Sequence, residues 1–217
     1  MTSREFRDRL ERSLGRASTP LPPTEQIAQL EGYFSLLTRW NTKINLTALP
    51  LTGPTDETFD RLMAEPLAAQ RHSHAPKGMW YDLGSGGGSP AIPWKIVEPQ
   101  RPLTMVESKS RKAAFLREAV RALQLEECSV QNSRFENLTT AALTVQLVTV
   151  RAVRPDETLI GTARHLLGPG GVLVLFQPSQ AVARYSGFAH VKTTRLLRSK
   201  LSYAAVYHRV FHVEHSC

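Results

Sequence analysis

The sequence has few of the features that mark membrane, secreted or metal-binding proteins. It has no uninterrupted apolar stretch near the roughly 20 residues that a membrane-spanning helix needs, and its start, MTSREFRDRLERS, is too charged for a signal peptide. The two cysteines, Cys128 and Cys217, are too few and too widely spaced for a disulfide framework or a zinc site. We therefore expect a cytoplasmic protein with no membrane contact and no bound metal.

Acidic residues are also absent from a long part of the chain, between Glu157 and Glu214. Such a basic segment would gain affinity for a polyanion such as RNA by releasing counterions, although a solvated basic surface without a partner is the alternative. The formal net charge of +8 favours nucleic acid as the partner. The seven basic residues of this segment are Arg164, Arg184, Lys192, Arg195, Arg198, Lys200 and Arg209.

The first 75 residues predict a helical extension that packs on a larger domain. Apolar residues at helical spacing indicate one helix around Phe6 to Leu14 and a second, capped by Thr24, that continues to Ile44. A third helix is expected from about Asp56 to Gln70, with Pro66 as a kink or an early end.

From Met79 the pattern changes to short apolar runs that alternate with helical segments, which is typical of a Rossmann-like α/β domain with a mostly parallel sheet. We assign residues 76–217 to this domain, and its last two strands predict a β-hairpin at the sheet edge. The expected strands are 79–83, 103–107, 128–131, 145–150, 172–176, 189–197 and 204–213. The expected helices are 90–97, 108–123 and 155–167, the last stopped by a Gly-Pro-Gly-Gly run.

The sharpest local signal is the glycine-rich segment from Asp82 to Pro90, placed between a predicted strand and a predicted helix. An open α/β sheet binds its ligands at such a position. Gly84, Gly86 and Gly88 would let the backbone approach a ligand at the helix N-terminus. The alternative is a flexible turn without a ligand.

Two ligands fit this loop by pattern alone, a dinucleotide and S-adenosylmethionine. Asp82 would repel a pyrophosphate and attract the positive charges of a sulfonium amino acid, so it favours S-adenosylmethionine. Asp82 could instead cap the amides of the glycine turn. Glu107, at the end of the second strand, could accept hydrogen bonds from ribose hydroxyls, which both ligands carry.

Beyond this loop, several segments resemble the bacterial small-subunit ribosomal RNA methyltransferase G family, also called glucose-inhibited division protein B. The similarity runs from about Gln26 to the end of the hairpin. It is carried by LLTRWNTKINLT at 36–47, DLGSGGGSPAIP at 82–93, and Glu107-Ser108 followed by Arg111-Lys112 and Phe115-Leu116.

The resemblance implies an enzyme that transfers a methyl group from S-adenosylmethionine to N7 of a guanine in 16S ribosomal RNA. Phe135 and Glu136 would flank the adenine, and Arg151 would reach the cofactor or the target base. The candidate cofactor-binding residues are Asp82, Gly84, Gly86, Gly88, Ser89, Glu107, Phe135, Glu136 and Arg151. The candidate RNA-binding residues are Arg61, Arg111, Lys112, Arg134, Arg195, Arg198 and Lys200.

Four positions depart from the family pattern. Leu62 stands where the family commonly has histidine, Ser89 replaces a larger apolar residue, Ala91 replaces glycine, and Gln177 replaces lysine. Because glutamine cannot replace a lysine charge at a phosphate, these departures indicate a divergent member of the family.

Guanine N7 has an in-plane lone pair, so methylation there needs no general base and we assign no catalytic acid or base. Arg151 is expected to position the base, or alternatively to pair with Asp82 or Glu107. Arg151 and Gln177 are expected to project into the same crevice.

The partners expected are ribosomal RNA or the small subunit, bound by a monomer. Two other readings stay open, a non-catalytic RNA-binding or ribosome-assembly protein and a nicotinamide-dependent oxidoreductase.

Overall fold

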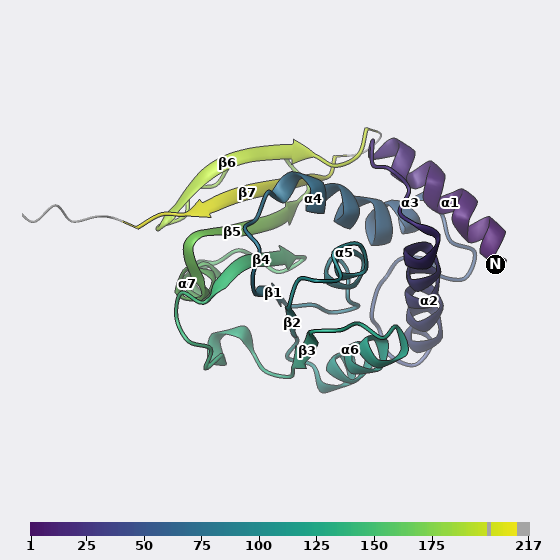
Figure 1. Ribbon diagram of the computed structural model, residues 1–217, viewed down its shortest axis with the longest axis horizontal. Helices are drawn as coiled ribbons and strands as arrows, with labels where there is room; N and C mark the ends of the chain where they lie inside the picture. The colour runs from purple at the N-terminus through teal and green to yellow at the C-terminus, as the bar shows by residue number, and fades with distance from the viewer. Residues whose placement is uncertain (199–200, 212–217) are drawn as a thin grey trace, which may run out of the picture.

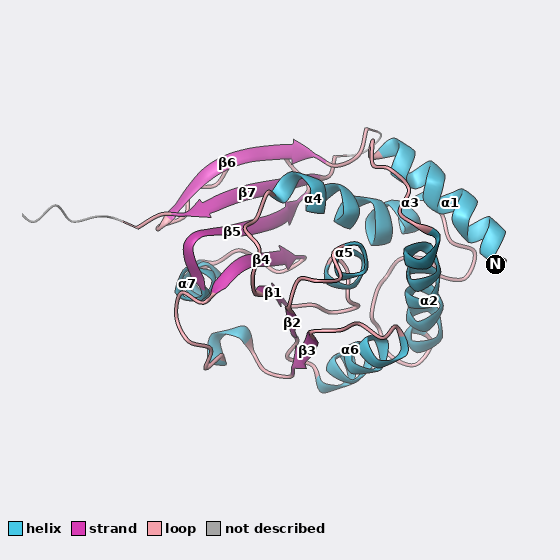
Figure 2. Ribbon diagram, in the orientation of Figure 1, coloured by secondary structure: helices cyan, strands magenta, loops and turns pink. Residues whose placement is uncertain are grey.

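A computed structural model describes residues 1–198 and 201–211, which form a seven-stranded sheet with helices on both faces (Figures 1 and 2). The predicted α/β class, with a mostly parallel sheet and a C-terminal hairpin, is confirmed. The N-terminal part contains α1 (Ser3–Arg16), α2 (Thr24–Asn41), α3 (Asp56–Phe59), the π-helical turn η1 (Asp60–Ala64) and α4 (Glu65–Ser73). The remaining helices are α5 (Ala91–Val97), α6 (Ser110–Ala122), the short 3-10 helix η2 (Phe135–Asn137) and α7 (Glu157–Leu166).

The strands run in the order β3-β2-β1-β4-β5-β7-β6. They are β1 (Trp80–Leu83), β2 (Leu103–Val106), β3 (Cys128–Gln131), β4 (Val145–Arg151), β5 (Leu167–Gln177), β6 (Phe188–Arg195) and β7 (Tyr203–Arg209). The first five are parallel, and β7 pairs antiparallel with both β5 and the edge strand β6. Leu83 pairs with Val106 and with Val150, so β1, β2 and β4 end close together.

Successive strand residues point to two separate apolar cores, as the alternation of side chains along a strand requires. Trp80 points to the face covered by α1, α2, α4, α5 and α6, where its ring lies 5.1 Å from that of Trp94. Tyr81 and Leu83 lie in the core of the opposite face, against α7. The N-terminal helices therefore share one hydrophobic core with the sheet.

The N-terminal helices begin and end as follows. Thr2 and Glu5 form a capping box at the start of α1, whose Phe6 packs with Phe34 of α2. Thr24 is the first helical residue of α2, and Pro23 occupies the cap position that we predicted for Thr24. The helix ends at Asn41, so Ile44 packs against the core from the following loop.

The predicted third helix is continuous in space but not regular. The wider π-helical turn η1 separates α3 from α4, which continues to Ser73. Of the two outcomes that we predicted for Pro66, a kink or an early end, the early end is therefore wrong. Pro66 is tolerated near the start of α4 although it has no N–H to donate to the carbonyl of Leu62, four residues earlier. The π-helical turn replaces that part of the ladder.

Two smaller boundaries differ from the prediction. The Gly-Pro-Gly-Gly run lies inside β5 rather than in a loop, where it produces a register shift against β4 between Val145 and Leu147. The hairpin strands are shorter than expected at their ends, and residue 213, where we placed the last strand's end, lies outside the described residues. A helix with the length and hydropathy of a membrane span is not found in the described part of the chain.

Candidate functional site

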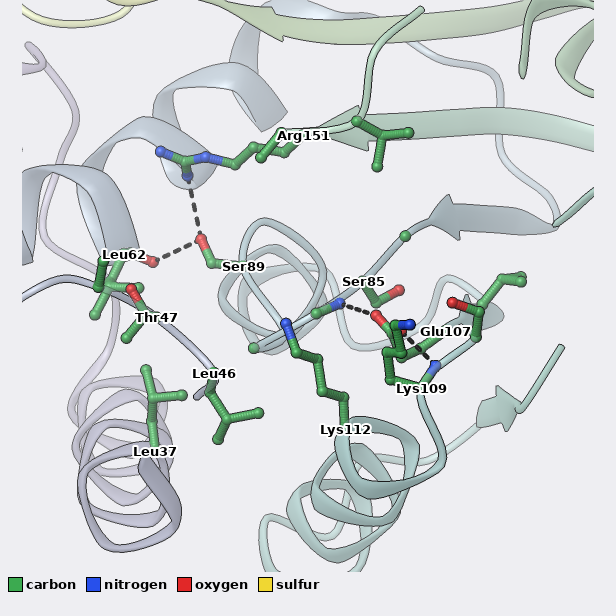
Figure 3. Close-up of a pocket in the computed structure, with 18 of the residues that line it drawn as sticks. Leu37, Leu46, Thr47, Leu62, Ser85, Ser89, Glu107, Lys109, Lys112 and Arg151 are labelled. Atoms are coloured by element: carbon green, nitrogen blue, oxygen red, sulfur yellow. Dashed lines mark hydrogen bonds between the residues drawn. The ribbon is translucent and has the colours of Figure 1, made fainter. Parts of the chain in front are cut away.

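A cavity of about 1060 Å³ opens at the carboxyl ends of β1, β2 and β4 (Figure 3). One wall is the glycine loop that joins β1 to α5, and Glu107 and the segment 133–136 continue it. The opposite wall comes from the N-terminal helices, through Leu37, residues 46–50, Glu57, Arg61 and Leu62. The volume lies just above the range of about 300–1,000 Å³ seen for ligand sites, which leaves room for a cofactor and a substrate group.

Three glycines of the loop have positive φ, but they serve different purposes. A side chain at Gly84 would place its Cβ 2.5 Å from Cγ2 of Val153, so tight packing against the neighbouring segment requires glycine there. Gly86 faces open space, where the nearest heavy atom to an added Cβ is 3.8 Å away. A loop that leaves this space clear can accept a ligand against its backbone. Gly88 is buried beneath the loop, against Ile92.

Glu107 clamps the loop and lies on the cavity wall. Its Oε2 accepts a hydrogen bond of 2.9 Å from the Gly86 amide, and Oε1 accepts one of 2.7 Å from the Lys109 amide (Figure 3). Each carboxylate oxygen has a second lone pair, so both can still accept from ribose hydroxyls. These contacts fit an adenosyl group at this position.

Asp82 lies beneath the cavity wall, although we expected it at the mouth of the loop. Its side chain is only 1% exposed, and it accepts a 2.5 Å hydrogen bond from Oγ1 of Thr149, which in turn accepts from the indole N–H of Trp80. Burial raises the pKa of Asp82 to about 6, against the opposing effect of the hydrogen bond from Thr149. Asp82 is therefore not part of the cavity lining, and its carboxylate contacts Thr149 beneath the loop.

Arg151 crosses from the end of β4 to the N-terminal wall. Its Nη1 donates to Oγ of Ser89 at 3.2 Å (Figure 3). The same Nη1 donates to the Arg61 carbonyl at 2.6 Å, and Nη2 donates to the carboxylate of Glu65. The ion-pair partner is thus Glu65, so neither alternative partner that we expected, Asp82 or Glu107, pairs with Arg151 in the described residues. Desolvation lowers the pKa of Arg151, and the Glu65 charge opposes this effect.

The segment at 36–47, which contains Trp40 and Asn41, shapes the opposite wall of the cavity. Oδ1 of Asn41 accepts from the amides of Leu46 and Thr47 at 2.8 and 3.0 Å, which closes the loop after α2 and places both residues on the cavity. The hydroxyl of Tyr33, buried in α2, donates to the Gly87 carbonyl at 2.7 Å. The N-terminal helices therefore position both the loop and the facing wall.

Basic side chains surround part of the cavity. Arg61, Lys112 and Arg134 were predicted to bind RNA and all three line it, together with Lys109, which we did not predict. Arg111 is exposed on α6 outside the lining. Arg195 is the last residue of β6 and Arg198 follows in the next segment, and neither lines the cavity. Lys200 falls outside the described residues.

Among the cofactor candidates, the cavity brings together Gly84, Gly86, Ser89, Glu107, Phe135, Glu136 and Arg151. Gln177 does not join Arg151 in the lining. Its amide donates instead to the carbonyls of Ser179 and Ala181, which closes the loop after β5. The sequence reasoning also missed Glu65, because no local pattern connects it with β4. No group of three or more residues that could hold a metal ion occurs within residues 1–198 and 201–211.

Comparison with known proteins gives one consistent family. The profile of the GidB family, described as rRNA small subunit methyltransferase G, matches residues 26–200. The ribosomal RNA small subunit methyltransferase G of Halorhodospira halophila is 38% identical over 148 residues, which is 68% of each chain. The Stenotrophomonas maltophilia K279a protein of the same name is 41% identical over 167 residues, 75% of this chain and 71% of the relative.

Other relatives are matched over a slightly smaller share of their length. The Xanthomonas oryzae protein of the same name is 41% identical over 149 residues, so the chain spans about two thirds, 66%, of that relative.

Solved structures support the fold. A SAM-dependent methyltransferase from Aquifex aeolicus superposes with a TM-score of 0.56 at 13% identity, over 68% of this chain and 91% of that one. A putative methyltransferase in complex with the Haloferax volcanii Trm112 methyltransferase activator gives the same TM-score of 0.56 at 13% identity, over 72% and 92%. At this identity the likeness establishes a methyltransferase-type fold.

Proposed function

The chain belongs to the rRNA small subunit methyltransferase G family, and we propose that it transfers a methyl group from S-adenosylmethionine to N7 of a guanine in 16S ribosomal RNA. The observation that carries this proposal is a single cavity with two kinds of lining. A cofactor-type glycine loop with Glu107 forms one wall, and basic side chains surround the opening. A ribosomal substrate also implies that the protein works in the cytoplasm.

The residues present fit S-adenosylmethionine. We assign the backbone at Gly86 to the approach of the cofactor, because space is left clear there. Glu107 would accept from the ribose hydroxyls, and Phe135 would lie against the adenine. When bound, the cofactor supplies a methyl group on a positively charged sulfur, whose bond to carbon breaks as the new nitrogen–carbon bond forms.

The chain has to hold the base in line for this transfer, not to move a proton. The N7 lone pair is free in neutral guanine, so no general base is needed. The protein then contributes by orienting the base and excluding competing geometries. Orientation can account for a large share of an enzyme's rate enhancement. Arg61, Lys112 and Arg134 at the cavity would hold the RNA backbone by charge.

Methyl transfer from labelled S-adenosylmethionine tests the proposal. Small ribosomal subunits and naked 16S RNA, both from cells that lack the family enzyme, serve as parallel substrates. Mass spectrometry of the digested RNA should show N7-methylguanosine with at least one of them. Tight RNA binding with no transfer to either substrate would favour the non-catalytic assembly role instead, and methylation at another atom would refute the N7 assignment.

We also propose that the protein acts as a monomer, because residues of one chain supply both walls of the cavity. Sedimentation with and without small subunits would test this. The third reading, a nicotinamide-dependent oxidoreductase, is inconsistent with the family assignment.

A further inference from the structure

The π-helical turn η1 leaves backbone carbonyl groups free next to the cavity. The Glu65 amide donates to the Asp60 carbonyl, one residue further back than in an α-helix, so it does not reach the Arg61 carbonyl. Pro66 has no N–H to donate to the Leu62 carbonyl. Two acceptors that a regular helix would use internally are therefore available to other groups.

Both free carbonyls accept from residues of the cavity wall. Nη1 of Arg151 donates to the Arg61 carbonyl at 2.6 Å, and the Ser89 hydroxyl lies 3.4 Å from the carbonyl oxygens of Arg61 and Leu62. Figure 3 shows the line of contacts from Arg151 through Ser89 to Leu62. The hydroxyl of Ser89 therefore joins the glycine loop to this turn.

The charge of Arg151 is balanced in the same place. The Arg151 side chain is 13% exposed, its partner Glu65 is 3% exposed, and Glu65 is the first residue of α4, directly after the turn. A guanidinium held by a carboxylate, a carbonyl and a hydroxyl has little freedom to rotate. These contacts use three of the five guanidinium N–H groups. Within the described residues no further hydrogen bond of Arg151 is found, so the Nε–H and one N–H of Nη2 remain for a ligand.

We propose that Glu65 is a positioning residue for methyl transfer, which together with the free carbonyls of η1 fixes the Arg151 guanidinium against Ser89 of the glycine loop. Arg151 then presents its two remaining N–H donors to the guanine in one orientation. Glu65 itself is not on the cavity surface and acts through Arg151. This inference rests on the proposed methyltransferase function.

The test compares Glu65→Gln, Arg151→Lys and the double variant in single-turnover transfer to the better of the two RNA substrates. Loss of orientation alone can cost on the order of a hundredfold, so we expect Glu65→Gln to lower the transfer rate by about 10- to 100-fold. The KM for RNA should change by less than about threefold, because a positioning defect acts on the transition state. The double variant should be no slower than Arg151→Lys alone, because residues that act through each other are non-additive.

Two controls separate positioning from folding. Affinity for S-adenosylhomocysteine, measured by calorimetry, should stay within about threefold in Glu65→Gln, because the Glu107 side of the cavity is untouched. Glu118→Gln removes an exposed ion pair with Arg121 on α6 and should leave the transfer rate unchanged.

The results distinguish a failure of the positioning role from a failure of the proposed function. An unchanged transfer rate in folded Glu65→Gln, or strictly additive losses in the double variant, would show that Glu65 has only a structural role. A wild-type protein that methylates neither RNA would refute the proposed function and this inference with it. A wild-type protein that is active, with Glu65→Gln equally active, would refute the positioning role alone.

Discussion

At the residue scale, Gly84 and Gly86 stand two positions apart and are required for different physical reasons. Gly84, at φ +79°, is closely packed against Val153, whereas Gly86, at φ +53°, faces the cavity. Packing against Val153 therefore requires glycine at position 84, which also lines the cavity. The two glycines allow a direct comparison of stability and binding.

We expect Gly86→Ala to weaken S-adenosylmethionine binding by about tenfold or more, and to lower the free energy of unfolding by only about 1 kcal/mol, the cost of a left-handed alanine. Gly84→Ala should cost about 2–3 kcal/mol, because a clash with Val153 adds to the same strain. Calorimetry and urea unfolding of both variants provide the measurement. Equal stability losses, with unchanged affinity in Gly86→Ala, would contradict the assignment of the cavity.

Asp82 predicts a pH dependence of stability. Its pKa is raised from 3.8 to about 6 in the folded protein, so the folded state binds this proton more tightly than the unfolded chain does. The resulting stabilisation is fully present below about pH 4 and is lost as the pH rises through about 6. The raised pKa reflects the cost of burying a charged carboxylate.

Asp82→Asn removes this titration. As the pH rises from about 4 to about 7, the variant should gain stability relative to the wild-type protein by at most about 3 kcal/mol. Urea unfolding across this range measures the difference, and Asp8→Asn, at an exposed position of α1, is the control. A difference between wild type and Asp82→Asn that does not vary with pH would rule out the raised pKa.

At the element scale, α1 does more than extend the chain, because it contacts the π-helical turn η1 that faces the cavity. Asp60, the first residue of η1, is 1% exposed and accepts from Oγ of Ser13 at 2.7 Å and from Nη2 of Arg16 at 2.6 Å. A buried carboxylate needs such partners, since an unpaired one is costly. These contacts with Asp60 connect α1 to η1, whose Arg61 carbonyl accepts from Arg151.

Arg16→Met should therefore lower the free energy of unfolding by about 2 kcal/mol, because Asp60 loses its charged partner while it stays buried. Arg12→Met, on the exposed face of the same helix, should change it by less than about 0.5 kcal/mol. Denaturant unfolding of both variants tests this. Similar values for the two would show that the ion pair with Asp60 contributes nothing beyond surface charge.

At the scale of the whole molecule, the protein carries a net positive charge, and part of it lies at the cavity, where it would attract a polyanion. The formal net charge is +8, and Lys109, Lys112 and Arg134 lie on one side of the cavity opening. RNA affinity should fall steeply with added salt, because each phosphate contact releases counterions.

Lys112→Gln should reduce the slope of log affinity against log salt by up to about 1, whereas Lys77→Gln should leave the slope as it is. Lys77 is exposed before β1, at the opposite end of the parallel strands from the cavity. Salt titrations of RNA binding measure both slopes. Identical slopes for wild type and Lys112→Gln would show that the RNA does not pass this side of the opening.

Local sequence patterns determined much of this protein. The alternation of strand and helix predicted the α/β class and the mostly parallel sheet with its C-terminal hairpin, since apolar periodicity depends on neighbouring residues alone. The glycine segment after β1 and Glu107 after β2 predicted where the cavity would lie, because parallel strands place their carboxyl ends at one edge. The resemblance to the family placed Phe135 and Arg151 near that edge, and both line the cavity.

Only the tertiary structure decided which side chains meet there. Glu65 and Arg151 are far apart in the sequence, and their pairing depends on a π-helical turn that helical periodicity does not reveal. Asp82 is buried beneath the loop, and hydrogen bonds within the loop after β5 hold the Gln177 amide away from the cavity, although both residues were predicted at or near strand ends. Periodicity shows which face of an element is apolar, but contacts between distant elements depend on packing, which no local pattern contains.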